Sequence, residues 1–199
     1  MKTILKDLAT ALLVTAVLTI LLCGAYPAAV WAAGQALFPA KANGSLVVGA
    51  DGTVRGSTLL AQNFSSDKYF QPRPSAAGTG YDATSSGGTN FGPTSQKLSD
   101  SIKAAVKAYR DSNGLAADAA VPADAVTSSA SGLDPHISPE NAQIQAARVA
   151  KARALPLEKV TALVTAATEG RDLGILGEAG VNVLRLNLAL DAISPAAGK

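Results

Sequence analysis

The chain has 199 residues, of which 48% are hydrophobic, with 17 Lys and Arg against 15 Asp and Glu. From Lys41 onward there are 15 basic and 14 acidic residues, a net charge of +1, and no two basic residues are adjacent. A nucleic-acid-binding surface needs a basic patch, so we expect no nucleic-acid partner. The length accommodates one modest domain and one additional segment.

An uncharged stretch lies between Asp7 and Lys41. It exceeds the ~20 apolar residues that a membrane-spanning helix needs. A cleaved signal peptide is the alternative, but its apolar region would usually cover only roughly 7 to 15 residues. Tyr26 and Trp31 also lie where a span would meet the far membrane interface. We therefore predict an uncleaved membrane anchor.

The charges around the anchor predict its orientation. The N-terminal tail carries Lys2 and Lys6 against Asp7. Because basic residues favour the cytoplasmic side, the N-terminus is expected in the cytoplasm and the domain outside. The predicted division of the chain is a cytoplasmic tail at 1–7, a transmembrane helix at 8–33 and an extracytoplasmic domain at 34–199.

Small residues recur at every fourth position of the anchor, at Ala11, Thr15, Thr19 and Cys23. This spacing places them on one helix face, where another membrane helix could approach closely. Alternatively, the threonines bond back to carbonyls of their own helix. Cys23 is the only cysteine in the chain, so the domain must be held together by its core or by partners.

Extended and irregular segments are predicted in the first part of the domain. Residues 45–48 and 53–62 flank an Asp-Gly turn, which predicts a hairpin. Residues 71–94 are dense in Gly, Pro, Ser and Thr and show no apolar periodicity, and they are too long for an ordinary connection. Because the segment contains Tyr81 and Phe91, and disordered linkers are poor in aromatic residues, we expect contacts with the rest of the domain to hold it.

Helices and one strand are predicted in the second part. Apolar residues from Leu98 to Tyr109 repeat at helical spacing before Gly114. Pro139 and Pro156 suit the first positions of two further helices. The segment VNVLRLNLALD (181–191) alternates leucine with polar residues, which is typical of a half-buried strand. The predicted fold class is α+β, with one transmembrane helix, a few strands and about three other helices.

The only histidine, His136, lies in SGLDPHISP (131–139). One histidine and no cysteine outside the anchor are too few ligands for a typical zinc site, so no metal is expected. A membrane-tethered hydrolase using His136 and Asp134 is an alternative function, although the nucleophile motif G-x-S-x-G is absent. The motif G-x-x-x-x-G-K-[ST], which binds phosphate, is absent as well. A rigid helix start is favoured, since Ser138 suits the N-cap and Pro139 the first helical position.

Several longer motifs follow one another along the chain. They are GS-x-L-x-x-Q-x-F (56–64), YFQPRPSA (69–76), SGGTNFGPT (86–94), SGLDPHISP (131–139), Q-x-x-RVA (145–150), GRDLGILGE (170–178) and VNVLRLNLALD (181–191). In this order, behind one N-terminal span, they resemble the C subunit of the bacterial Kdp potassium-transporting P-type ATPase. Ala179-Gly180 departs from the more usual Pro-Arg of that family.

The resemblance implies a non-catalytic accessory subunit of an ATP-driven pump for high-affinity potassium uptake in the bacterial inner membrane. The implied partners are a potassium-translocating A subunit, an ATP-hydrolysing B subunit and a small F subunit. The C subunit would be needed for assembly and would act as a catalytic chaperone that raises the ATP affinity of the B subunit. It would thus have no cofactor of its own and would share ATP with that subunit.

Candidate site residues follow from the motifs. Gln145 and Arg148 are candidates for a contact with ATP. Candidates for partner docking are Tyr69, Phe70, Arg73, Asp134 and His136. Because a P-type pump binds ATP in the cytoplasm and the charge rule places this domain outside, we expect the domain to dock on the A subunit near the ion entrance. It would then act on nucleotide through assembly or coupled conformations.

Overall fold

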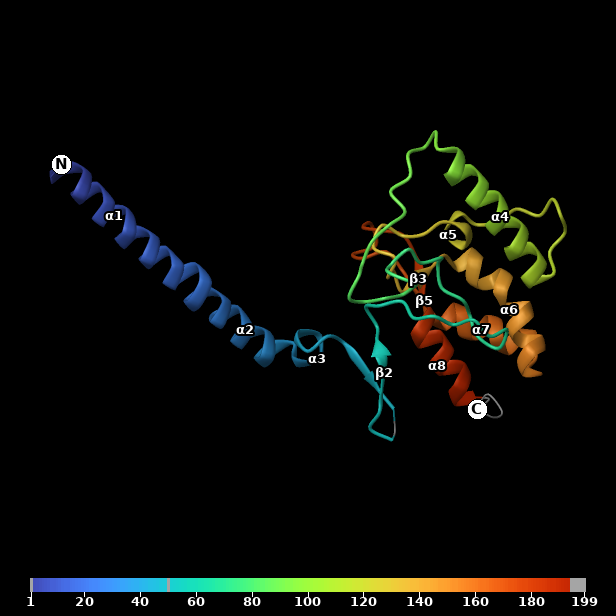
Figure 1. Ribbon diagram of the computed structural model, residues 1–199. Coiled ribbons are helices and arrows are strands. Elements are labelled where there is room, and N and C mark those ends of the chain that lie inside the picture. Colours follow the sequence, from blue (N-terminus) through green and yellow to red (C-terminus); the bar gives the residue numbers. More distant parts are fainter. Residues whose placement is uncertain (1, 50, 194–199) are drawn as a thin grey trace. The chain divides into compact units, whose positions relative to one another are not determined.

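The computed structural model describes residues 2–49 and 51–193. The chain separates into two compact units with the boundary between Leu46 and Val47. In Figure 1 the first unit is blue, and the second runs from cyan to red.

The first unit is a long apolar helix followed by a short one. It comprises α1 (Lys2–Thr19), a π-helical turn η1 (Ile20–Ala25), α2 (Tyr26–Leu37) and α3 (Pro39–Ala42). The stretch Thr3–Leu37 is long and apolar enough to cross a membrane, and an 18-residue window within it has a mean hydropathy of 2.4. At ~1.5 Å per residue it is about 50 Å long, which exceeds the ~30 Å hydrocarbon core of a bilayer.

The π-helical turn has a local cause. The Tyr26 N–H donates to Leu21 O, one residue further back than in an α-helix. Pro27 follows immediately, and a proline ring clashes with the carbonyl four residues before it, so a wider turn relieves that clash. In the predicted helix-contact face, the Thr19 hydroxyl donates to Thr15 O at 2.8 Å. This bond is the self-bonding arrangement considered above, and a helix contact at Ala11, Thr15 and Thr19 stays a prediction.

The predicted hairpin is confirmed. Strands β1 (Leu46–Val48) and β2 (Val54–Ser57) form a two-stranded sheet. At its turn the Gly49 N–H donates to Thr53 O at 2.8 Å, and the Asp51 carboxylate accepts from the Thr53 hydroxyl at 2.6 Å.

The irregular segment between Ser57 and Ser95 contains no helix or strand, yet it packs on the domain. Phe70 and Ala77 within it are completely buried. Its polar groups also pair with other segments, since the Ser75 hydroxyl donates to Gly132 O at 2.6 Å. The expectation that contacts elsewhere hold this segment is therefore confirmed.

The three predicted helices are present. They are α4 (Gln96–Asn113), α6 (Pro139–Arg153) and α7 (Leu157–Ala167), and a short α5 (Ala123–Val126) lies between the first two. The hydroxyl of Ser95 caps α4 by accepting from Leu98 N, and Gly114 ends it in the left-handed conformation at φ +64°. A glycine takes that conformation without the steric cost that other residues meet.

The prediction for the C-terminal segment was wrong. Only β5 (Gly180–Asn182) is a strand, and α8 (Val183–Ile193) follows directly. The buried positions Val183, Leu186, Asn187 and Leu190 have helical spacing. The leucine alternation concealed this pattern because the buried polar residue Asn187 lies on the inner face, and leucine itself favours helices.

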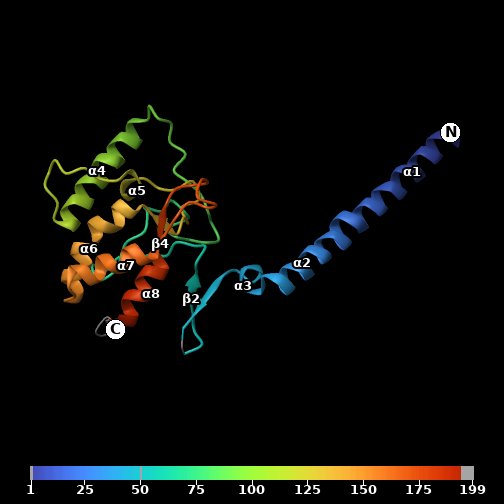
Figure 2. The ribbon, with the colours of Figure 1, turned by 180° about the vertical axis from the view of Figure 1, so that it is seen from behind.

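A small sheet and three helices surround the core. Strand β5 lies between β3 (His136–Ile137) and β4 (Thr168–Glu169), antiparallel to both, with His136 opposite Asn182 and Thr168 opposite Val181. Figure 1 and the reverse view in Figure 2 show α6, α7 and α8 side by side, with α4 on the outer side of α6. Phe70 inserts between them, beside Val149, Val164 and Leu186. The domain is thus α+β, and α8 and the short α5 come in addition to the three expected helices.

Candidate functional site

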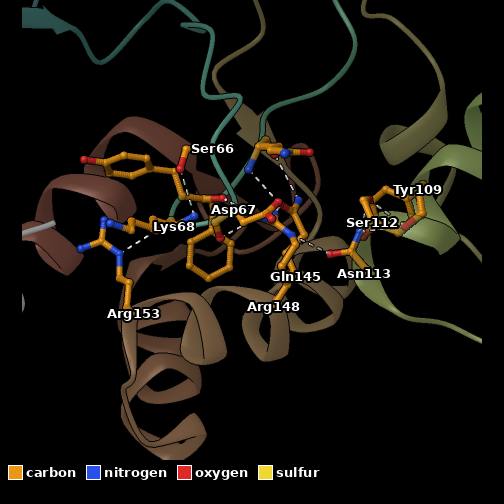
Figure 3. A network of polar contacts seen from close by, with 12 residues as sticks. Ser66, Asp67, Lys68, Tyr109, Ser112, Asn113, Gln145, Arg148 and Arg153 are labelled. Carbon is orange, nitrogen blue, oxygen red and sulfur yellow. Dashed lines mark hydrogen bonds and ion pairs between the residues drawn. The ribbon is translucent and has the colours of Figure 1, made fainter. Parts of the chain in front are cut away.

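Gln145 lies on α6, and its side-chain amide bonds to both the N–H and the C=O of one residue of the irregular segment (Figure 3). Its Oε1 accepts from the Gln71 N–H at 2.7 Å, and its Nε2 donates to Gln71 O at 3.1 Å. The same amide accepts from Arg148 Nη2 at 2.8 Å and donates to Asn141 Oδ1 at 2.9 Å. Gln145 is 1% exposed, and these four bonds use the whole capacity of its amide.

Arg148 holds the same segment one turn further along α6. Its Nη1 donates to Asp67 O at 2.9 Å and to Tyr69 O at 3.1 Å, and its Nε donates to Asn113 Oδ1 at 3.1 Å. Burial lowers the pKa of the guanidinium, while the nearby Asp67 carboxylate opposes that shift. With the bond from Nη2 to Gln145, all three guanidinium nitrogens of Arg148 donate to groups within the domain.

Two further side chains hold residues 67–71, and together with Gln145 and Arg148 they form what we call the clamp. Asn187 on α8 accepts from Phe70 N at 2.8 Å and donates to Phe70 O at 2.9 Å. Arg153 donates to Lys68 O at 2.6 Å and to Asp191 Oδ1 at 2.7 Å, and its guanidinium lies 4.7 Å from the centre of the Tyr69 ring. The backbone of residues 67–71 is thus hydrogen-bonded to side chains, much as the backbone of a strand is bonded to its neighbours. We call residues 67–71 the clamped segment.

The clamp favours an architectural role for its members. A nucleotide phosphate would require cationic donors directed toward it, whereas the nitrogens of Gln145 and Arg148 are directed at the clamped segment and its surroundings. Sequence reasoning had selected Gln145, Arg148, Tyr69 and Phe70 but missed Asn187. In a helical interpretation of 183–193, Asn187 lies one turn from both Val183 and Asp191, on the same helix face. That position would have signalled a polar residue on the inner face of the helix.

His136 lies in a separate pocket of about 530 Å³, lined among others by Arg73, Asp134, Glu169 and Glu178. The imidazole Nδ1 is 3.7 Å from Asp134 Oδ1, and Nε2 is 3.7 Å from Glu169 Oε2. Asp134 also accepts from Arg73 Nη1 at 3.1 Å and from the His136 backbone N–H at 3.0 Å. Three predicted docking residues, Arg73, Asp134 and His136, therefore meet at one half-exposed site.

The geometry around His136 gives the hydrolase alternative no support. In a Ser-His-Asp triad, the imidazole nitrogen remote from the aspartate faces the serine hydroxyl. Here that nitrogen, Nε2, faces the Glu169 carboxylate. The pair of carboxylates instead suits a protonated, positively charged imidazole.

The start of α6 agrees with the predicted motif. The Ser138 hydroxyl accepts from Asn141 N at 3.1 Å and donates to Asp124 Oδ1 at 2.9 Å. Asp124 also accepts from Ser138 N at 2.8 Å and from Asn141 Nδ2 at 2.9 Å. Asp124, which sequence reasoning missed, thus joins α5 to the cap of α6.

His136 should make the stability of the domain depend on pH. Asp134, followed by Glu169, raises the pKa of His136 above its ordinary 6.5, while burial and Arg185 oppose the shift. A raised pKa means that the stabilisation is complete below pH 6.5 and is lost as the pH rises through the folded value. We expect His136→Gln to lower the free energy of unfolding more at about pH 5.5 than at about pH 9.

The size of this effect is limited by solvent. The His136 side chain is 39% exposed, so screening should keep the difference below about 1 kcal/mol. Asp134 does not complicate this window, because its pKa is lowered from 3.8, mainly by its contact with His136, and its own contribution is lost only under more acidic conditions. Urea denaturation of the two proteins at both pH values measures the difference. An equal difference at the two pH values would contradict the assignment.

Comparison with known proteins identifies the family. The family model described as the K+-transporting ATPase c chain, KdpC, matches residues 8–192. The chain belongs to the KdpC family. Two potassium-transporting ATPase KdpC subunits are similar to it over most of their length. That of Nitratidesulfovibrio vulgaris is 55% identical over 92% of each chain, and that of Rhodospirillum rubrum is 54% identical over 97% of this chain and 99% of its own.

A third KdpC subunit, with lower sequence identity, is also similar to the chain over most of its length. The KdpC subunit of Mycobacterium tuberculosis is 50% identical over 94% of this chain and 99% of its own length. Because the family match covers nearly the whole chain, the resemblance inferred from the motifs is confirmed. A KdpC chain is an accessory subunit of the ATPase and is not an enzyme by itself.

The KdpC motifs of this chain meet in space. Gln71 and Gln145 join motif 69–76 to motif 145–150. The Gly87 N–H donates to Ser131 O at 2.9 Å, which joins motif 86–94 to motif 131–139. Asn182 donates to Thr58 O at 2.8 Å, which joins motif 181–191 to motif 56–64. Much of the motif pattern therefore describes how an irregular chain is fastened to its core.

Proposed function

We propose that this chain is a non-catalytic accessory subunit that assembles and stabilises a high-affinity, ATP-driven potassium uptake pump. Membership of the KdpC family over residues 8–192 carries the proposal. The apolar helix Thr3–Leu37 supports it, since it is long enough to anchor the chain among membrane subunits. The partners would be the potassium-translocating A subunit, the ATP-hydrolysing B subunit and the small F subunit.

The proposed location is the bacterial inner membrane, with a cytoplasmic tail at 1–7, a span at 8–33 and an extracytoplasmic domain at 34–199. Lys2 and Lys6 support this orientation by the positive-inside rule. Of the docking candidates, Arg73, Asp134 and His136 retain exposed surface and would contact the A subunit near the ion entrance. Tyr69 and Phe70 would contribute indirectly, by holding the clamped segment.

The proposed effect on nucleotide is indirect. In this mechanism, the chain raises the ATP affinity of the B subunit by favouring the pump conformation that binds ATP, as a catalytic chaperone would. The internal bonding of Gln145 and Arg148 supports an indirect effect, since their nitrogens already donate to the domain itself. ATP would remain the cofactor of the complex.

Omitting this chain from a reconstituted pump tests the function. We expect the remaining subunits to lose most of their potassium-dependent ATPase activity and to bind ATP more weakly. Adding back the full-length chain should restore both properties. A pump that assembles, hydrolyses ATP and binds nucleotide equally well without the chain would contradict the proposal.

Thiol labelling in intact cells tests the orientation. In a Cys23→Ser background, Ser101→Cys places a thiol on an exposed position of α4, and Thr3→Cys places one at the N-terminal end. A membrane-impermeant maleimide should label the first variant in intact cells and the second only after lysis. The reverse pattern would place the domain in the cytoplasm and exclude the proposed orientation.

A further inference from the structure

The turn between β4 and β5 is the loop beside β4 in Figure 2. It carries three exposed apolar side chains. Leu173 is 88% exposed, Ile175 75% and Leu176 56%. We call residues 171–178 the tip. Single exposed leucines are common on protein surfaces, whereas three apolar side chains gathered on a protruding turn indicate a contact surface.

The tip is ordered by its own bonds. The Asp172 N–H donates to Leu176 O, and the Leu176 N–H donates to Asp172 O, both at 2.9 Å. Below this pair, Arg171 Nη2 lies 3.2 Å from Glu178 Oε2. A turn closed in this way presents its apolar side chains in a fixed geometry, which reduces the entropy lost on binding.

Leu173 adopts a conformation that leucine ordinarily avoids. Its φ is +54°, and that of Gly174 is +77°. Successive residues with positive φ at the centre of a short hairpin turn favour Asn-Gly, because asparagine tolerates the left-handed region better than leucine does. Leu173 therefore adds backbone strain and gains no burial within the domain. Such strain indicates a functional constraint on the position.

We propose that the tip inserts into an apolar recess with a basic rim on the potassium-translocating A subunit of the pump. This inference rests on the proposed function, and it extends the docking surface of the His136 pocket, because Asp172, Leu176 and Glu178 of the tip also line that pocket. The recess would bury Leu173 and Ile175, and its rim would face the acidic side chain of Asp172. Leu173, as the most exposed of the three, would insert deepest.

Charge favours a protein recess over a lipid surface. Within the tip, Arg171 balances Glu178, and Asp172 leaves a net charge of −1. The tip also contains no lysine, tryptophan or tyrosine. Peripheral lipid-binding segments are usually rich in basic residues and in interfacial aromatic residues. Anionic membrane surfaces repel acidic side chains such as that of Asp172.

The substitution Leu173→Asn separates binding from folding. Asparagine relieves the strain at positive φ, so the full-length chain should unfold at an equal or higher temperature. The variant loses the apolar side chain, however, and should weaken docking about tenfold or more, as loss of a buried interface anchor does. The control is Leu157→Gln at the other end of α7, where a leucine is 48% exposed and stays within a helix.

The measurement is recovery of the full-length chain with the whole pump. All subunits are co-expressed, the complex is purified through a tag on the ATP-hydrolysing subunit, and recovery is followed over a dilution series. Wild type and Leu157→Gln should be recovered equally, and Leu173→Asn about tenfold less. Equal recovery of Leu173→Asn would overturn the inference and leave the proposed function intact. Failure to recover the wild type would overturn both.

Photo-crosslinking identifies what the tip contacts. A photo-reactive amino acid replaces Ile175 in the assembled pump, and the membranes are irradiated before solubilisation. A crosslink to the A subunit supports the inference, and a crosslink to another subunit in its place would overturn it. Crosslinks to lipid alone, or a chain that remains uncrosslinked within an assembled pump, would overturn it.

Discussion

Replacing Gln145 with leucine is expected to lower the free energy of unfolding of the domain by about 3 kcal/mol or more. The change removes four hydrogen bonds at a position that is 1% exposed. It leaves the backbone N–H and C=O of Gln71 without their partner, and it also removes an acceptor from the buried Arg148. Unpaired buried polar groups each cost about 1–3 kcal/mol, and more when charged.

Gln143 provides a matched control on the same helix. It is exposed, two residues from Gln145, so Gln143→Leu should change stability by less than about 0.5 kcal/mol. Urea denaturation of the full-length proteins in detergent, followed by the near-ultraviolet circular dichroism of the domain's tyrosines, measures both changes. If Gln145→Leu keeps wild-type stability but weakens ATP binding by the assembled pump, Gln145 contacts nucleotide and the indirect mechanism is wrong.

Replacing Phe70 with alanine should have the largest effect on the core, about 3–5 kcal/mol. Phe70 is 0% exposed and packs among side chains from α6, α7 and α8. Its backbone is held at both polar groups by Asn187, so the segment cannot move easily to fill the resulting cavity. The loss of apolar contacts and the remaining cavity therefore add.

Phe91 is the corresponding control in the same irregular segment. It is only partly buried, and the ammonium of Lys97 lies 5.2 Å from the centre of its ring. Phe91→Ala should therefore cost about 1 kcal/mol or less. The denaturation midpoints of both variants in urea check the comparison. Similar midpoints would show that Phe70 lies on a surface, as a direct docking role requires.

The chemistry of the candidate site was only partly predictable. The SGLDPHISP segment indicated a capped helix because the Ser-Pro pair acts locally, through the backbone next to it. The partners of His136 and Gln145 were not predictable in the same way. Glu169 and Gln71 lie 33 and 74 residues away from them, and only the folded chain brings such distant groups together.

The sequence by itself determined the apolar helix, the hairpin turn, the end of the helix before Gly114, the helix starts at Pro139 and Pro156 and, through its motifs, the family. These features depend on interactions over a few residues: apolar run length, turn chemistry, proline and glycine positions, and capping. The tertiary structure decided that residues 183–193 form a helix, that Phe70 enters the core and that residues 67–71 are clamped by Gln145, Arg148 and Asn187. In each case a buried polar side chain or an irregular backbone gains its stabilising partner only from a distant segment, so local pattern and propensity do not specify the outcome.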